Sequence, residues 1–453
     1  MNTDKLSTLT ELIAKNAKQL SIHKWDYGAS FSNDYSVQVD RGVAKQLKAS
    51  QKQILTLRVL NKKNQVGITT TSDLSEYGLK KALNQANQAS AYGNQNEQTN
   101  FSPLAKMIIE HKKPDEKNPA GIKKLLTVLK EAEKDLLKKH PSIKSVPYNG
   151  LSESFFKRIY ANSEGASRFY KNSQAALYLY ARAEESEKKP RSSGSFKLGH
   201  FLQEIDIDSC VNEAADKTIS HLNYEPIKTG KYKVCFSPEA FLTLISAFSS
   251  IFNARSIIDG VSISNKNSLG EIIGSEGLNL YDDGLHEKNI SSAPFDGEGT
   301  PTQKLCIINA GKLTNLIHSE STARIFNTNP TGHAGLGSKV SVSPDWLIVE
   351  RSEHVSSFDD TLNHQTYLGD FVLIEELNAI HAGVKSSQGA FSLPFDGWFV
   401  KDGEKISIES ATVAGDFKML LKEIINIEEI QEITTSGIAP HVWISNLSIT
   451  GEA

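Results

Sequence analysis

His286 and Glu287 stand side by side in the stretch LYDDGLHEKNIS. Zinc hydrolases use such a pair on a helix, with a second histidine about one turn further on. The two histidines bind one ion, an open position holds water, and the glutamate accepts a proton from that water. Here the residues at the fourth and fifth positions after His286 are Ile290 and Ser291. This pair therefore lacks the partner that would make it a zinc motif.

More histidines are scattered over the C-terminal half of the chain, namely His318, His333, His354, His364, His381 and His441. Isolated histidines are more often surface residues or hydrogen-bonded core residues than metal ligands. Their spacing leaves open whether some of them converge on a metal site.

A second group of reactive side chains lies in PFDGEGT, which contains Pro294, Phe295, Asp296, Glu298 and Gly299. A proline and two glycines favour a rigid turn, which can present carboxylates or backbone groups to a peptide or to a partner subunit. In the simpler interpretation, the two carboxylates only accept hydrogen bonds from backbone N–H groups inside the loop. Both interpretations stay open, and we place these five residues near a cleft or a partner.

The composition is that of a soluble globular protein. Of the 453 residues, 39% are hydrophobic and 23% are charged, and the net charge of −3 gives no indication of nucleic acid or an anionic membrane as a partner. No apolar run approaches the ~20 residues that span a bilayer, and the start MNTDKLSTLT does not resemble a secretory signal. The three cysteines, Cys210, Cys235 and Cys306, are few and far apart, which is typical of a reducing compartment. We expect a cytoplasmic protein.

Patterns of apolar residues indicate the elements that position these groups. Residues 4–20 have helical spacing, and Tyr35, Val37 and Val39 alternate with polar residues as in a strand. Asp73 followed by Glu76 resembles a capping box at the start of a helix. A further amphipathic helix is predicted at 122–139, and its polar face mixes lysines with acidic residues, as on a solvated surface.

From residue 231 onward, short strands and many glycines replace the long helices, apart from one helix predicted at 238–252. We therefore expect the α+β class, with N-terminal helices on small antiparallel sheets and a β-rich C-terminal domain. The predicted N-terminal domain covers 1–222, with sub-parts at about 1–92 and 122–222 and a linker at 93–121. The predicted C-terminal domain covers 228–453.

Several stretches together resemble the TldD/PmbA family. They are ANSEG, AADKTISHLNYEPIKTGKYKVCFSPEAFLTLI (214–245), PFDGEGTPTQ (294–303) and INAGKLTNLIHSESTARIFNTNPTGHA (308–334), in the family's order and spacing. The resemblance covers most of the chain and is weakest over 93–150. By this resemblance His333, in TGHA, joins the residues placed near the cleft.

The resemblance implies cytoplasmic proteins of two types that pair into a zinc metallopeptidase acting on small or unfolded peptides. The TldD-like subunit carries zinc on a helix with His-Glu-x-x-x-His, helped by a cysteine near its C-terminus. The PmbA-like (TldE) subunit usually lacks that histidine pair and completes the cleft. The family was also named for modulation of DNA gyrase.

The metal ligands of the TldD type are missing from this chain. The motif would fall near Ile245–Ser250, but no histidine occurs between His221 and His286, and no cysteine follows Cys306. We therefore assign no catalytic residue, metal ligand or cofactor to this chain and expect zinc in a TldD-like partner. The expected partners are that subunit, or a second copy in a homodimer, and a peptide substrate, but no membrane.

Two alternatives stay open. One is a self-sufficient metallopeptidase whose ligands come from the scattered histidines. The other is a non-enzymatic modulator that binds DNA gyrase or nucleic acid. Only the lysines of the 122–139 helix support nucleic-acid binding, which we do not expect.

Overall fold

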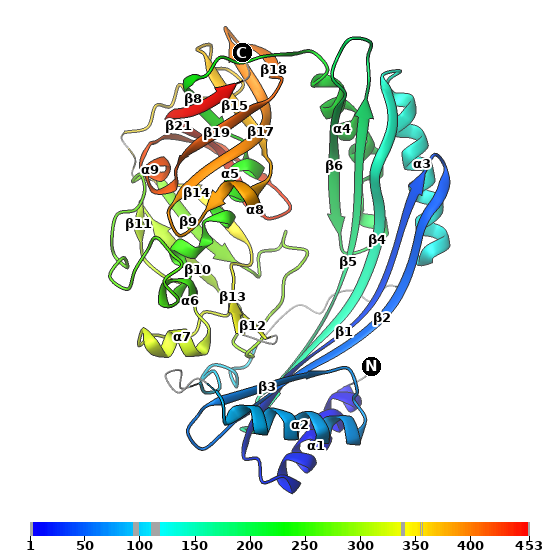
Figure 1. Ribbon diagram of the computed structural model, residues 1–453, viewed down its shortest axis with the longest axis vertical. Coiled ribbons are helices and arrows are strands. Elements are labelled where there is room, and N and C mark those ends of the chain that lie inside the picture. Colours follow the sequence, from blue (N-terminus) through cyan, green and yellow to red (C-terminus); the bar gives the residue numbers. More distant parts are fainter. Residues whose placement is uncertain are drawn as a thin grey trace.

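The computed structural model describes residues 3–93, 99–109, 118–336, 340–353, 355 and 357–451. Its N-terminal part is one antiparallel sheet of six strands, in the order β3 (Val66–Thr71), β2 (Val43–Leu60), β1 (Lys24–Asp40), β4 (Ile143–Asn162), β5 (Ser167–Ala183) and β6 (Arg191–Gly199). The long strands run along much of the molecule and curve toward its lower end (Figure 1). Because β1 pairs with β4, strands from before and after residues 93–121 belong to the same sheet.

Helices cover one face of this sheet. They are α1 (Thr3–Gln19), α2 (Glu76–Ser90), α3 (Gly121–Lys139) and α4 (Ile207–Ser220). Side chains alternate between the faces of a strand, so Tyr27 and Ala29 of β1 share a face with Val37. The first two pack in the core under α1 and α2, and Val37 packs in the core under α3 and α4. The opposite face of the sheet, which carries Arg58, contacts the C-terminal part of the chain.

The cap of α2 differs from the prediction. Ser75 is the N-cap residue, and its Oγ accepts a hydrogen bond from the backbone N–H of Gly78 at 3.1 Å. Asp73 lies before the helix, where its Oδ1 accepts a hydrogen bond from the backbone N–H of Ser75 at 3.0 Å. Both residue types favour this role, and the serine is the one placed to reach the first turn.

The C-terminal part contains a closed ring of strands, in which β21 (Gly437–Gly451) pairs with β8 (Gly230–Phe236) and with β19 (Ala411–Asp416). The ring is completed by β15 (Phe371–Leu377) and β17 (Ala390–Lys401). The sheet extends through β7 (Tyr224–Glu225), β9 (Leu278–Asp283), β10 (Lys304–Asn309), β11 (Lys312–Leu313), β14 (Leu347–Arg351), β16 (Val384–Lys385), β18 (Glu404–Ile408) and β20 (Ile424–Ile433). A separate hairpin consists of β12 (Ala334–Leu336) and β13 (Val340–Val342).

Short helices accompany this barrel: α5 (Pro238–Ala247), α6 (Ala254–Ile258), α7 (Glu320–Ile325), α8 (Ile380–Gly383) and α9 (Phe417–Lys422), with a 3-10 turn at Ser249–Phe252. The other 3-10 turn, Leu202–Glu204, belongs to the N-terminal part. The largest core of the molecule surrounds α5 and includes Phe236, Ile374 and Val442 from the ring strands. The α+β class with a β-rich C-terminal domain is therefore confirmed. Among the described residues, no helix combines the length and the apolar character that crossing a membrane requires.

Candidate functional site

Helix α5 is where the metal-bearing type of subunit would carry zinc. Ser237 caps the helix, since its Oγ accepts a hydrogen bond from the backbone N–H of Ala240 at 3.1 Å, and Pro238 begins it. Behind this start the helix runs into the barrel core, with Phe241 and Leu244 fully buried. The sequence thus makes α5 a packing element.

The residues of α5 and the following turn do not fit a zinc ion. Ile245 and Phe248 are buried apolar side chains, and the Phe248 ring stacks on Phe417 with 4.4 Å between the ring centroids. Ser246 and Ser249 offer only hydroxyl groups, which are not among the histidine, cysteine and carboxylate ligands that hold zinc in proteins. The C-terminal segment approaches this helix, because a Cβ on Gly437 would lie 3.3 Å from Leu242 Cδ1, and no cysteine stands there.

The predicted PFDGEG loop lies where the barrel meets the N-terminal sheet. Phe295 packs in a buried cluster with Tyr160 and Tyr170 of that sheet. Gly299 has a φ of +76°, and a Cβ there would lie 2.4 Å from the Tyr160 ring, so only glycine allows this close approach. Pro294 is buried, and its carbonyl accepts a hydrogen bond from the backbone N–H of Thr302 at 3.1 Å.

Asp296 accepts hydrogen bonds from backbone N–H groups of its own loop, as in the simpler interpretation of the sequence. Its Oδ1 accepts hydrogen bonds from the backbone N–H groups of Glu298 at 2.8 Å and Thr300 at 3.0 Å. Its Oδ2 accepts one from Ala334 N–H at 2.9 Å, which connects the loop to β12. Burial, together with the nearby Glu298 carboxylate, raises the pKa of Asp296 to about 7.

Glu298 reaches across to the N-terminal sheet. Its Oε1 lies 2.7 Å from Nη1 of Arg58 on β2, and its Oε2 accepts a hydrogen bond from Glu320 N–H, at the start of α7, at 2.8 Å. Arg58 also binds Asp26 of β1, with 2.9 Å from Nε to Oδ1 and 2.5 Å from Nη2 to Oδ2. Burial alone would lower the pKa of Arg58, but Asp26 and Glu298 outweigh it and hold that pKa well above its usual value. We call Asp26, Arg58 and Glu298 the buried ion triad.

His333 lies on the far side of the same loop, next to Ala334. Its Nδ1 is 2.8 Å from the Thr331 hydroxyl, and its Nε2 is 3.7 Å from Oδ2 of the fully buried Asp282. Burial lowers the pKa of His333, but Asp282 outweighs burial and raises it above its usual value. Asp345 is also close, because ligand atoms of Asp282, His333 and Asp345 lie within 4.8 Å of one another.

The cluster around His333 is less open to a metal than that spacing suggests. Both oxygens of Asp282 already accept backbone hydrogen bonds, from Asp345 N–H at 2.8 Å and Trp346 N–H at 3.2 Å.

The structure brings the six predicted residues to one region between the two parts of the chain. They are Pro294, Phe295, Asp296, Glu298, Gly299 and His333. Whether that region acts on a ligand stays a prediction.

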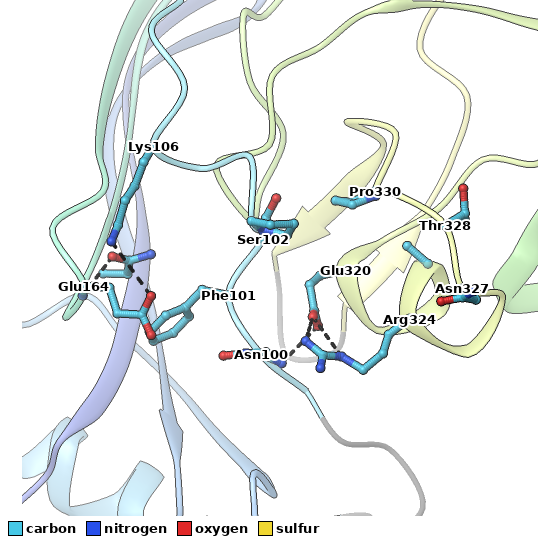
Figure 2. A pocket seen from close by; sticks show the side chains of 13 residues that line it. Asn100, Phe101, Ser102, Lys106, Glu164, Glu320, Arg324, Asn327, Thr328 and Pro330 are labelled. Atoms are coloured by element: carbon cyan, nitrogen blue, oxygen red, sulfur yellow. Dashed lines mark hydrogen bonds and ion pairs between the residues drawn. The ribbon is translucent and has the colours of Figure 1, made fainter.

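A pocket of about 450 Å³ opens beside this region (Figure 2). It is lined by Asn100, Phe101 and Lys106 from the predicted linker, by Glu164 from the turn of ANSEG, and by Arg324 of α7. Figure 2 shows Glu320 and Arg324 pointing toward each other beside Asn100. The Glu320 carboxylate binds the Arg324 guanidinium and accepts a hydrogen bond from Asn100 N–H at 2.9 Å. Burial is the main cause that raises the pKa of Glu320.

The remaining histidines have different surroundings. His286 sits in a turn, where its Nδ1 accepts a hydrogen bond from Lys288 N–H at 3.2 Å, and His381 is exposed on α8. His318 is buried against Phe326, and burial lowers its pKa to about 4. His354 lies outside the described residues. His364 and His441 lie close together, and Glu428 is next to both.

Comparisons with known proteins agree with the resemblance. Residues 112–222 match the model of the PmbA/TldA metallopeptidase central domain, and residues 229–451 match that of the PmbA/TldA metallopeptidase C-terminal domain. The metalloprotease PmbA of Escherichia coli O157:H7 is 23% identical over 398 residues, which are 86% of this chain and 84% of the relative. A metalloprotease of Methanocaldococcus jannaschii is 27% identical over 316 residues, 68% of each chain.

The fold is also that of solved relatives. The crystal structure of TldE from Thermococcus kodakarensis superposes with a TM-score of 0.81 at 20% identity and covers 98% of this chain and 100% of its own. Together, the two matched ranges cover well over half of this chain. This chain therefore belongs to the TldD/PmbA family, and within it resembles the PmbA type.

Proposed function

We propose that this chain is the PmbA/TldE-like component of a TldD/TldE-type zinc metallopeptidase system that degrades or trims peptides, and that it is the subunit that lacks the catalytic metal site. One observation carries the proposal. Around Ile245–Ser250, where the resemblance places the zinc motif, α5 and the following turn offer only apolar side chains and serine hydroxyls, and the one carboxylate of α5, Glu239, lies six residues before Ile245. Such a subunit contributes surface, shape and substrate contacts, while a TldD-like partner supplies the ion that activates water.

The pocket beside α7 is where we place contacts with the peptide. It combines an aromatic ring, Phe101, with two ion pairs, Lys106–Glu164 and Arg324–Glu320, and this charge-balanced lining suits an apolar side chain next to the polar groups of a peptide backbone. Replacing Arg324 with alanine should raise KM for peptides in the assembled enzyme more than it lowers kcat, because in this proposal the residue shapes the peptide-binding pocket and takes no part in the bond cleavage. Replacing Lys15, an exposed lysine on α1, with alanine serves as the matched control.

The test of the proposal is reconstitution. The chain and a TldD-like protein of the same organism are purified separately, and hydrolysis of a quenched fluorescent peptide library is measured for each alone and for the mixture. We expect hydrolysis that depends on both proteins and is abolished by a chelator. A Glu→Gln change in the partner's His-Glu-x-x-x-His should abolish it, whereas Ser246→Ala in this chain should not. Chelator-sensitive hydrolysis by this chain alone would overturn the proposal in favour of a self-sufficient peptidase.

The nucleic-acid alternative has little support in the structure. The lysines of α3 share their face with acidic residues, and Lys138 lies 3.5 Å from Asp135. Neutralising Lys123, Lys124, Lys138 and Lys139 should leave any DNA binding of the chain unchanged at physiological salt. A loss of salt-dependent DNA affinity in that variant would favour the alternative.

A further inference from the structure

His364, Glu428 and His441 form a polar group on the barrel that the proposed function does not use. His364 precedes β15, Glu428 lies on β20 and His441 lies on β21. One ligand atom from each of the three lies within 4.8 Å of the other two. The side chains of His364, Glu428 and His441 are 15%, 5% and 9% exposed, so the group is largely buried, with its most open side at His364.

The group lies on the other side of the barrel wall from α5. Val442 and Ile444 of β21 point into the core around α5, and side chains alternate along a strand, so His441 and Trp443 point the opposite way. Trp443 belongs to a separate apolar cluster with Cys235, Phe371 and Leu373. The group is therefore distinct from the position where the metal-bearing type of subunit would hold zinc.

Hydrogen bonds and ring stacking bring the three residues together. Glu428 Oε1 accepts hydrogen bonds from the backbone N–H of His364 at 2.8 Å and from Trp443 Nε1 at 2.9 Å. Its Oε2 lies 2.9 Å from His364 Nδ1. Unlike the Asp282 oxygens, this Oε2 accepts no backbone hydrogen bond from the described residues, so it is the oxygen that remains for an ion. The His364 and His441 rings stack, with 3.6 Å between centroids and an interplanar angle of 11°. Two imidazoles and a carboxylate at this spacing are the donor set that zinc and similar divalent transition metals prefer.

A second carboxylate completes the surroundings, since Glu432 Oε1 lies 3.7 Å from His441 Nδ1. A carboxylate beside one ring nitrogen orients the other nitrogen toward a metal and increases its basicity. Glu432 is 55% exposed and stands at the edge of the group. Two buried imidazoles with two nearby carboxylates thus provide both ligands and orientation.

We propose that His364, Glu428 and His441 bind one divalent transition-metal ion, which fastens the segment before β15 to strands β20 and β21. The ion adds to the contacts that already hold that segment, among them the hydrogen bonds from Asn426 Nδ2 to the Leu362 carbonyl at 2.8 Å and from Asp359 N–H to the Ile425 carbonyl at 3.2 Å. Binding turns the stacked rings apart, because the lone pair of each nitrogen lies in the plane of its own ring. The ion bridges two distant parts of the sequence and stabilises the fold by mass action.

The test uses the full chain, treated with a chelator and then dialysed. Zn²⁺ is titrated by calorimetry, and the imidazole proton resonances are followed by NMR. We expect about one equivalent of Zn²⁺ and a shift of the resonances of both stacked rings. His364→Phe and His441→Phe keep an aromatic ring in the stack but remove the nitrogen donors, and each should weaken binding at least ~10-fold. His381→Phe, at an exposed histidine, is the control and should bind as the parent does.

Equal Zn²⁺ affinity in the parent and in both Phe variants would overturn the proposal, as would absence of binding to the parent. A Phe variant that fails to fold is replaced by Glu428→Gln, which keeps one oxygen acceptor and removes the anionic charge. The inference goes beyond the proposed function, because it assigns a structural metal to this chain. Zn²⁺ bound without hydrolysis by this chain alone is compatible with the proposed function, whereas chelator-sensitive hydrolysis by this chain alone that is lost in His364→Phe and His441→Phe would favour the self-sufficient peptidase.

Discussion

The buried ion triad supports a quantitative prediction. Arg58 is fully buried and makes charge-assisted hydrogen bonds to Asp26 and Glu298. Arg58→Met preserves much of the side-chain volume but leaves two carboxylates in the interior without a cation. Removing one partner of a buried ion pair typically costs about 3–5 kcal/mol, because the charge that remains is uncompensated.

The assay is urea unfolding followed by tryptophan fluorescence, since Trp25 lies on β1 next to Asp26. With a urea slope of about 3 kcal/mol/M, the loss corresponds to a midpoint lowered by roughly 1–1.7 M at pH 7.5. The triple variant Arg58→Met, Asp26→Asn, Glu298→Gln should recover part of the loss, because it removes the uncompensated charges.

Lys15→Met is the matched control. Lys15 pairs with Glu76 at 2.7 Å, but both side chains are more than half exposed, at 57% and 52%. An exposed pair contributes about 0–1 kcal/mol, so this variant should unfold close to the parent. If Arg58→Met shifted the midpoint no more than Lys15→Met does, the triad would not stabilise the fold as argued here.

Three further predictions follow from the same structure. Gly299→Ala should destabilise the chain by about 1–3 kcal/mol in urea unfolding, because alanine is strained at a φ of +76° and its Cβ meets the Tyr160 ring. Gly28→Ala should cost less, because its Cβ meets only the end of the Leu336 side chain. Equal losses of stability in the two variants would contradict this prediction. Burial lowers the pKa of His318 to about 4, so the unfolded chain binds the proton more readily, and stability should fall as the pH drops from about 6.5 toward 4; a His318→Gln variant with the same pH profile would refute that assignment. Burial raises the pKa of Cys210 to about 11 and that of Cys235 well above its usual value, so Ellman's reagent at pH 8 should modify Cys306 alone in the folded chain, and rapid reaction of a second thiol would contradict this burial.

Local patterns predicted the elements well. Leu125, Leu129 and Leu136 identified the amphipathic helix α3, and all three are fully buried. The alternation of Tyr35, Val37 and Val39 with polar residues identified strand β1. These signals succeed because periodicity depends on which side of a single element is buried.

Contacts between distant parts of the sequence could not be predicted in this way. Arg58 occupies a polar position in an alternating strand, which ordinarily indicates the solvent side, yet its partner Glu298 lies 240 residues further on. The polar stretch at 93–121 resembled a linker, but Phe101 and Ala105 within it are buried and border the site. Only the tertiary fold decides whether a polar strand face meets water or another domain.

The PFDGEG loop follows the whole N-terminal sheet in the sequence, and this order affects how the chain folds during synthesis. All strands of the N-terminal sheet end by Gly199, so the whole sheet can emerge from the ribosome before residues 294–336 have been synthesised. Until then the face that carries Gly28, Arg58 and Tyr160 is uncovered, because Leu336, Glu298 and Phe295 have not yet emerged. Domains that emerge first tend to fold first, and exposed apolar surface favours aggregation. Nascent chains halted near residue 290 should therefore need chaperones more than the complete chain released from the ribosome.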